Sequence, residues 1–310
     1  MADDIDPTDV ADESAPVADA APKRRPRVAV VVLSVVLALA VIAIAALVTL
    51  LVLASDRIDE QDEKIQEQEE LIDQKETFGA AMEKLIDTAR TFEGTLMGDL
   101  VPVDEYARLA DLAWVHRWTS AALDRDTQRI DQERVKLETL RAEADEQAAS
   151  NATRSTYEKV TDRLGGGFVA SVIDNADALC EDDVLACVMG DDPYTVHFDK
   201  SDSAQPYMTD VIKTGIAYHE FAHVLQMTNP EPTEVALEAF GGDFETMADC
   251  YALTYLPGWT LDHTVWVSSF QYWEVSIGYG HTCTKSQRAV IRDWYDELGV
   301  RIAPITQSES

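Results

Sequence analysis

An uncharged apolar stretch, residues 28–54, constrains the fold more than any other part of this sequence. As a helix it would be about 40 Å long, which exceeds a hydrocarbon core of roughly 30 Å. The apolar region of a cleaved signal peptide usually has about 7–15 residues, and no clear small-residue cleavage site precedes the polar sequence at Ser55. A retained single-pass membrane anchor is therefore the favoured interpretation, with a signal peptide as the alternative.

The charges that flank this stretch predict its orientation. Residues 23–27 are mostly basic, whereas residues 56–60 are mostly acidic. Because basic flanks remain in the cytoplasm, we expect a cytoplasmic N-terminus and an extracytoplasmic C-terminal domain at the cell membrane.

The acidic composition excludes one class of partner. Acidic residues outnumber basic residues by 57 to 25, and the formal net charge is −32. Binding to a phosphate backbone depends on Lys and Arg, so we expect no nucleic-acid partner. Residues 1–27 begin with an acidic run rich in Ala and Pro, which predicts a disordered cytoplasmic tail.

The segment after the apolar stretch has a strongly helical composition. Ile58, Ile65 and Ile72 recur every seven residues, as in a coiled coil. Residues 55–150 are therefore predicted to form a helical, coiled-coil-like extracytoplasmic region that could self-associate. A single amphipathic helix that packs on the following domain is the alternative.

Residues 151–310 are predicted to form a second region that contains the chemistry. Two stretches rich in Val, Phe and Tyr, residues 168–173 and 194–198, predict short strands, and residues 205–300 are predicted to be mostly helical. The fold class expected for the whole chain is α+β and mostly helical, after a transmembrane helix and a helical stalk.

One pentapeptide in this region, His219-Glu220-Phe221-Ala222-His223, has the spacing of a metal site. Positions i and i+4 of a helix share one face, so the two imidazoles can bind one tetrahedral Zn²⁺. Glu220 adjoins the first ligand and can accept a proton from a metal-activated water. Thr209 or Asp210 is the expected N-terminal cap of this helix, and Asn229-Pro230 is its expected end.

A catalytic zinc site usually has three protein ligands and one open position. A second predicted helix starts near Asp243 and stops before Pro257, and on it Glu245 and Asp249 share one face. Glu245 is the candidate third ligand, and Asp249 can accept the N–H of a ligating imidazole. Without the preceding pentapeptide, both carboxylates would be interpreted as solvated helix residues.

All four cysteines lie in the C-terminal half, on the expected outer side, which predicts two disulfides. Three pairings are possible. The favoured one joins Cys180 to Cys187 as a local loop and Cys250 to Cys283 as a long-range link. Buried free thiols are the alternative.

These segments together resemble the gluzincin metallopeptidases of thermolysin type, and more closely the bacterial neutral zinc metallopeptidases. Those proteins pair an H-E-F-x-H-x-x-Q helix with an E-x-x-A-D-C-x-A helix, as residues 219–226 and 245–252 do here. Residues 280–288 are similar to a further H-G-[ST]-x-x-Q-R segment, although Thr282-Cys283 departs from it. The resemblance covers about residues 190–300. It implies a zincin-like domain with one Zn²⁺, His219, His223 and Glu245 as ligands, and Glu220 as general base.

His281 is a candidate donor that would stabilise the oxyanion of a tetrahedral intermediate, with Tyr218 and Tyr251 as alternatives. The function expected from these residues is zinc-dependent hydrolysis of a peptide or protein substrate. A membrane-tethered scaffold with a structural or silent zinc site is the alternative. Glu220 argues against the scaffold, because a structural site needs ligands but no general base.

Overall fold

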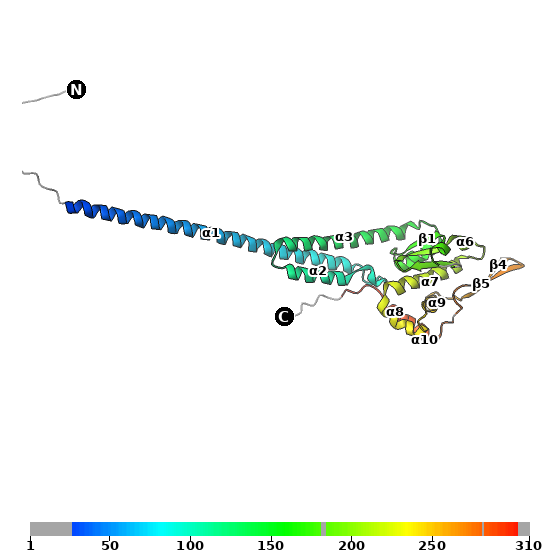
Figure 1. The fold of residues 1–310 in the computed structure, drawn as a ribbon. Coiled ribbons are helices and arrows are strands. Elements are labelled where there is room, and N and C mark those ends of the chain that lie inside the picture. Colours follow the sequence, from blue (N-terminus) through cyan, green and yellow to red (C-terminus); the bar gives the residue numbers. More distant parts are fainter. Residues whose placement is uncertain (1–26, 181–183, 281, 303–310) are drawn as a thin grey trace, which may run out of the picture. The chain divides into compact units, whose positions relative to one another are not determined.

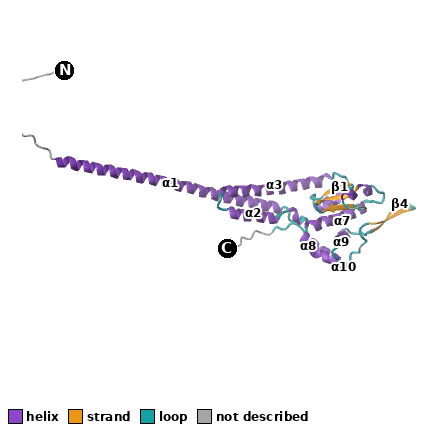
Figure 2. Ribbon diagram, in the orientation of Figure 1, coloured by secondary structure: helices purple, strands orange, loops and turns teal. Residues whose placement is uncertain are grey.

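The computed structural model describes residues 27–180, 184–280 and 282–302. Within them the chain is mostly helical with five short strands, as expected for the α+β class (Figures 1 and 2). The chain divides into two compact units, residues 1–67 and 68–310. The predicted acidic tail lies outside the described residues, apart from Arg27.

The first unit contains the start of one long helix, α1 (Arg27–Arg90). From Val35 this helix is long and apolar enough to cross a membrane, and it is the only described helix of that kind. Its apolar side chains, such as Leu37 and Leu50, are exposed. The segment could therefore be a membrane anchor or a signal sequence, and its orientation stays a prediction.

The second unit begins within α1 and adds two further helices, α2 (Val103–His116) and α3 (Ser120–Ser150). Leu85 and Ala89 of α1 are fully buried, and the Ser120 hydroxyl of α3 donates to Glu70 of α1 at 2.8 Å. This part of α1 therefore packs within its own chain, as in the alternative of a single amphipathic helix. In contrast, Ile72 is exposed, so self-association through the isoleucine series stays a prediction.

The second unit also contains a three-stranded sheet in the order β1-β3-β2. β1 (Ala170–Asp174) runs parallel to β3 (Asp192–Asp199), and β2 (Ala186–Met189) runs antiparallel to it. The two strands predicted from the sequence correspond to β1 and β3. The short strand β2 was not predicted, and it forms one edge of the sheet.

The remaining helices surround a central one, α7 (Asp210–Thr228), which packs against β2, β3, α4 and α9. The other helices and 3-10 turns of this unit are η1 (Gly98–Leu100), α4 (Thr156–Gly165), α5 (Ala176–Leu179), α6 (Lys200–Ser203), α8 (Pro230–Leu237), η2 (Glu238–Phe240), α9 (Phe244–Tyr255) and α10 (Lys285–Glu297). Side chains from α1, α2, α3, the sheet, α7, α9 and α10 join one hydrophobic core, with Phe221 and Leu225 of α7 fully buried in it.

One segment departs from the helical structure expected for residues 205–300, which are otherwise mostly helical. Residues 262–276 form an antiparallel hairpin of β4 (Asp262–Ser268) and β5 (Gln271–Ser276). Val265 and Val275 pack against the core, and Trp266 pairs with Tyr272 on the alternate face. The β-branched and aromatic residues of this segment favour a strand over a helix.

Candidate metal centre

The pentapeptide lies in the middle of α7, and local interactions define both ends of that helix. The Thr209 hydroxyl accepts the N–H of Ile212, which caps the N-terminus as expected. The helix ends at Thr228, just before Asn229-Pro230. Nearly every side chain from Gly215 to Gln226 is buried, so the polar residues of the pentapeptide face a largely enclosed region.

The second helix, α9, also begins at a side-chain cap. The Asp243 carboxylate accepts the N–H groups of Glu245 and Thr246, and the helix begins where the sequence predicted. Because α9 packs against α7, its first turn lies next to the two histidines. The sequence-predicted ligands are thus brought together from two helices.

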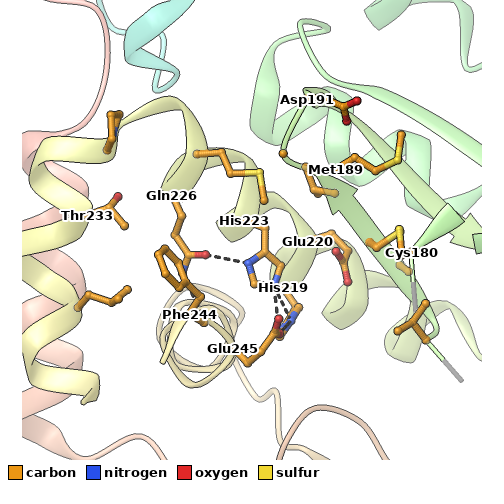
Figure 3. Close-up of a pocket in the computed structure, with 18 of the residues that line it drawn as sticks. Cys180, Met189, Asp191, His219, Glu220, His223, Gln226, Thr233, Phe244 and Glu245 are labelled. Atoms are coloured by element: carbon orange, nitrogen blue, oxygen red, sulfur yellow. Dashed lines mark hydrogen bonds and ion pairs between the residues drawn. A yellow bond between two sulfur atoms is a disulfide. The ribbon is translucent and has the colours of Figure 1, made fainter. Parts of the chain in front are cut away.

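His219, His223 and Glu245 converge on one point (Figure 3). The Nε2 atoms of the two histidines are 3.1 Å apart. Glu245 Oε2 lies 3.0 Å from Nε2 of His219 and 3.1 Å from Nε2 of His223. Three ligand atoms, each from a different side chain, therefore form a nearly equilateral triangle.

This triangle fits a small divalent cation. For tetrahedral coordination at about 2.0–2.1 Å, neighbouring ligand atoms are roughly 3.3 Å apart. The observed separations are only slightly shorter, and two imidazoles with one carboxylate are a donor set that divalent transition metals bind. The described residues therefore include a group that could hold a metal ion, as predicted; the identity of that ion as zinc stays a prediction.

Each histidine is oriented by a hydrogen bond on its other ring nitrogen. His219 Nδ1 lies 2.8 Å from Asp249 Oδ1, in the arrangement that the sequence predicted. His223 Nδ1 lies 2.7 Å from Gln226 Oε1, and the Gln226 amide donates to the Phe244 carbonyl. Both Nε2 atoms are thereby directed toward Glu245. Sequence reasoning assigned no role to Gln226, although its i+3 spacing from His223 was visible.

Asp249 is itself fixed by the segment that follows the hairpin. Its Oδ2 accepts the N–H of Tyr279 at 2.9 Å, and the Tyr279 ring stacks near the His219 ring with centroids 6.1 Å apart. Gly278 has a φ of +97°, and a Cβ there would lie 2.5 Å from Asp249 Oδ1. Only glycine meets both requirements. No periodic pattern in the sequence pointed to this contact.

The electrostatics of the cluster favour positive charge between the imidazoles and carboxylates. Burial lowers the pKa of His219, but hydrogen bonds to Asp249 and Glu245 outweigh it and raise the pKa to about 10. For Glu245, burial raises the pKa, but the two imidazoles hold it well below its usual range. The same carboxylates that stabilise an imidazolium would stabilise a bound cation.

Glu220 differs from Glu245 and Asp249, whose carboxylates hydrogen-bond to the imidazoles. Its side chain is buried, and its Oε2 atom has no hydrogen-bond partner among the described residues. Burial raises its pKa, while His219 and His223 oppose the rise. Figure 3 shows the carboxylate of Glu220 within the pocket that both imidazoles line. A buried carboxylate oxygen without a partner is costly, so the position of Oε2 calls for a functional explanation.

A cavity of about 940 Å³ opens onto this cluster. One wall is the edge strand β2, and the other is formed by α8 and the start of α9, including Leu237 and Phe244. A second cavity of about 380 Å³ extends toward Trp259 and Ile277, and its lining shares His219 and Glu220 with the first. The ligand cluster therefore lies where two cavities meet.

The other sequence-predicted residues have different outcomes. Both favoured disulfides are confirmed, Cys180–Cys187 beside the cavity and Cys250–Cys283 between α9 and the segment before α10. His281 lies outside the described residues, so its predicted role stays a prediction. Tyr218 and Tyr251 are buried in the core.

Comparisons with known proteins add no assignment. No protein-family model matches the chain, and no curated protein or solved structure is significantly similar to it. The function is therefore inferred from the geometry of the site.

Proposed function

We propose that this chain is a membrane-anchored zinc peptidase, with His219, His223 and Glu245 as metal ligands and Glu220 as general base. The observation that carries the proposal is the buried, unpaired Oε2 of Glu220 beside a complete set of three ligand atoms. A purely structural site would need the ligands but would gain nothing from this carboxylate.

The donor set favours zinc in a catalytic role. Two imidazoles and one carboxylate match a zinc site that retains an open fourth position, whereas structural zinc sites close that position with Cys or His. All four cysteines are in disulfides and cannot ligate. The large cavity next to the cluster leaves space for a substrate at the open position.

A bound Zn²⁺ would polarise a substrate carbonyl and lower the pKa of a coordinated water molecule toward ~7. The residues of the chain would then carry the protons. Glu220 would accept the proton of the attacking water and later transfer a proton to the leaving amine. Asp249 and Gln226 would hold the imidazole rings in one tautomer and orientation throughout.

The edge strand β2 supports a polypeptide substrate. In the described part of the chain it pairs only with β3, and its residues from Ala186 line the larger cavity. An extended peptide could add to this edge by backbone hydrogen bonds, which would place a peptide bond beside the ligand cluster. The apolar N-terminal helix would anchor the enzyme, with its active site on the extracytoplasmic side.

The test uses the full-length chain in detergent, loaded with one equivalent of zinc. We expect chelator-sensitive hydrolysis of a peptide pool, restored by added zinc. Glu220→Gln should retain the metal and lose about 10²–10⁴-fold in turnover, because an amide cannot accept the proton. Glu234→Gln, an exposed glutamate that lines the same cavity, is the matched control and should remain active.

Two outcomes would contradict the proposal. If the zinc-loaded parent hydrolyses no peptide, the alternative of a scaffold with a silent site is favoured. If Glu220→Gln loses the metal, this residue is a ligand and its assignment as base is wrong.

A further inference from the structure

The hairpin β4–β5 carries a cluster of exposed aromatic side chains, which includes the most exposed large hydrophobic side chain among the described residues, Phe270. Phe270 is 96% exposed, Trp266 63% and Tyr272 51%. We call these three residues the aromatic tip. Aromatic residues are enriched at protein interfaces relative to the rest of the protein surface. The aromatic tip is therefore a candidate binding surface.

The base of the hairpin is continuous with the metal centre. The Ile277 N–H donates to the Leu261 carbonyl at 2.7 Å, which closes the hairpin. Both residues line the second cavity, together with His219 and Glu220. The next residues, Gly278 and Tyr279, contact Asp249. A molecule that leaves the ligand cluster through the second cavity therefore meets the hairpin.

The chemistry of the hairpin points to a polypeptide as the occupant. Residues 262–276 contain no Lys or Arg, and the chain has a net charge of −32, so a nucleic acid or an anionic lipid surface would be repelled. In the described part of the chain β4 and β5 pair only with each other, which leaves backbone groups on both strands open to a further strand. Exposed aromatic rings complement apolar side chains on an extended chain.

We propose that the hairpin is a substrate-binding arm, which holds apolar segments of an extended polypeptide at a distance from the bond that is cleaved. This inference rests on the proposed peptidase function and adds a substrate class, namely long non-native chains cleaved at internal bonds. Two cavities that meet at the ligand cluster leave space for chain on both sides of the scissile bond, as internal cleavage requires.

The length of the arm defines a sharp test. The seven residues of β4 span roughly 23 Å, whereas four residues of extended peptide span roughly 13 Å. An eight-residue peptide centred on the cluster therefore cannot reach the tip, but a protein chain can. Removing the tip should weaken the binding of long substrates and leave short ones unaffected.

The experiment compares the full-length chain with the double variant Trp266→Ser/Phe270→Ser. Both side chains are exposed, so the variant should keep the parent's thermal unfolding midpoint. Trp114→Ser, which removes another exposed indole from α2, is the matched control. Binding of reduced, carbamidomethylated lysozyme, an unfolded chain without net negative charge, is measured in the Glu220→Gln background, so that no cleavage occurs. Cleavage of an eight-residue quenched peptide is measured in the active background.

We expect at least a tenfold weaker binding of the carbamidomethylated protein by the double variant, with cleavage of the short peptide unchanged. Unchanged binding would overturn the arm. Two other results would also overturn the arm. In the first, the double variant loses cross-linking between copies of the chain; in the second, it loses the quenching of tryptophan fluorescence by brominated lipid that the parent shows. Those results would identify a second copy or the bilayer as the occupant. Because binding is read without turnover, a failure of the proposed peptidase chemistry would leave this readout intact and appear only in the cleavage assay.

Discussion

At the scale of single residues, the metal centre separates ligation from orientation. Glu245 offers one candidate ligand atom, whereas Asp249 reaches the site only through Nδ1 of His219 and the backbone of Tyr279. Both are carboxylates on one face of a helix, four residues apart, so their spacing alone does not distinguish their roles. Their different contacts lead to different expected variants.

Removal of these two carboxylates should weaken metal binding to different extents. Asp249→Asn keeps an oxygen for one partner but cannot accept from both His219 and Tyr279, so zinc affinity should fall about 10–100-fold. Glu245→Ala removes a ligand atom and should cost more than that. Zinc affinity is measured by competition with a chromophoric chelator, and Glu234→Ala serves as the control. If Asp249→Asn binds zinc more weakly than Glu245→Ala, the two roles are reversed.

A second residue-scale prediction concerns a carboxyl group outside the metal centre. Burial, with a contribution from Glu158, raises the pKa of Asp162 to about 6, and Asp162 Oδ1 has no partner among the described residues. An acid whose pKa is raised by folding stabilises the protein below about pH 4, and this contribution is lost as the pH rises through about 6.

Asp162→Asn should therefore raise the free energy of unfolding at pH 7. The gain should be about 1 kcal/mol, since the side chain is partly solvated, and it should be smaller at pH 5. Urea unfolding at both pH values measures it, with Asp111→Asn, an exposed position of α2, as the control. A gain that is equal at the two pH values would exclude titration of Asp162 as the cause.

At the scale of helices and strands, α9 connects the metal centre to the rest of the domain. Cys250 in α9 is bonded to Cys283 across 33 residues, whereas the Cys180–Cys187 bond closes only 7. In the chain-entropy model, a disulfide stabilises more when it closes a longer loop.

The Cys250→Ala/Cys283→Ala variant should lose about 2–4 kcal/mol of unfolding free energy. The matched variant Cys180→Ala/Cys187→Ala should lose about 1.4 kcal/mol less, from the dependence on loop length. Denaturant unfolding followed by tryptophan fluorescence measures both. An equal or greater loss for the short loop would show that native packing, not chain entropy, dominates.

The elements that the sequence predicted well are those with a local signal. The cap at Thr209, the stop at Asn229-Pro230 and the i, i+4 pairs defined α7 and α9, and both disulfide pairings were anticipated.

In contrast, β2 has only four residues, and its strand character comes from pairing with β3. The hairpin β4–β5 was missed because its two strands lie within a stretch that is otherwise helical. The Tyr279 contact was missed because it joins distant segments through a backbone N–H.

At the scale of the whole molecule, the apolar part of α1 and the disulfides lead to a topology prediction. Disulfides persist in oxidising compartments, and the flanks of the apolar segment favour a cytoplasmic N-terminus. Protease added to spheroplasts should remove a C-terminal tag and spare an N-terminal one, and detergent should expose both. A protected C-terminal tag would show the opposite orientation.

Because so many contacts of the site come from α9, insertions and deletions of residues in this helix should not be tolerated. Within about two turns, α9 and its N-terminal cap provide the Asp243 hydrogen bonds, the candidate ligand atom of Glu245, the Asp249 contacts and the Cys250 bond. Each residue inserted into a helix rotates all that follows by about 100°. One insertion between Glu245 and Cys250 would therefore misdirect at least one of these connections. Insertions and deletions among relatives of this chain should be confined to its loops and should leave the length of α9 constant.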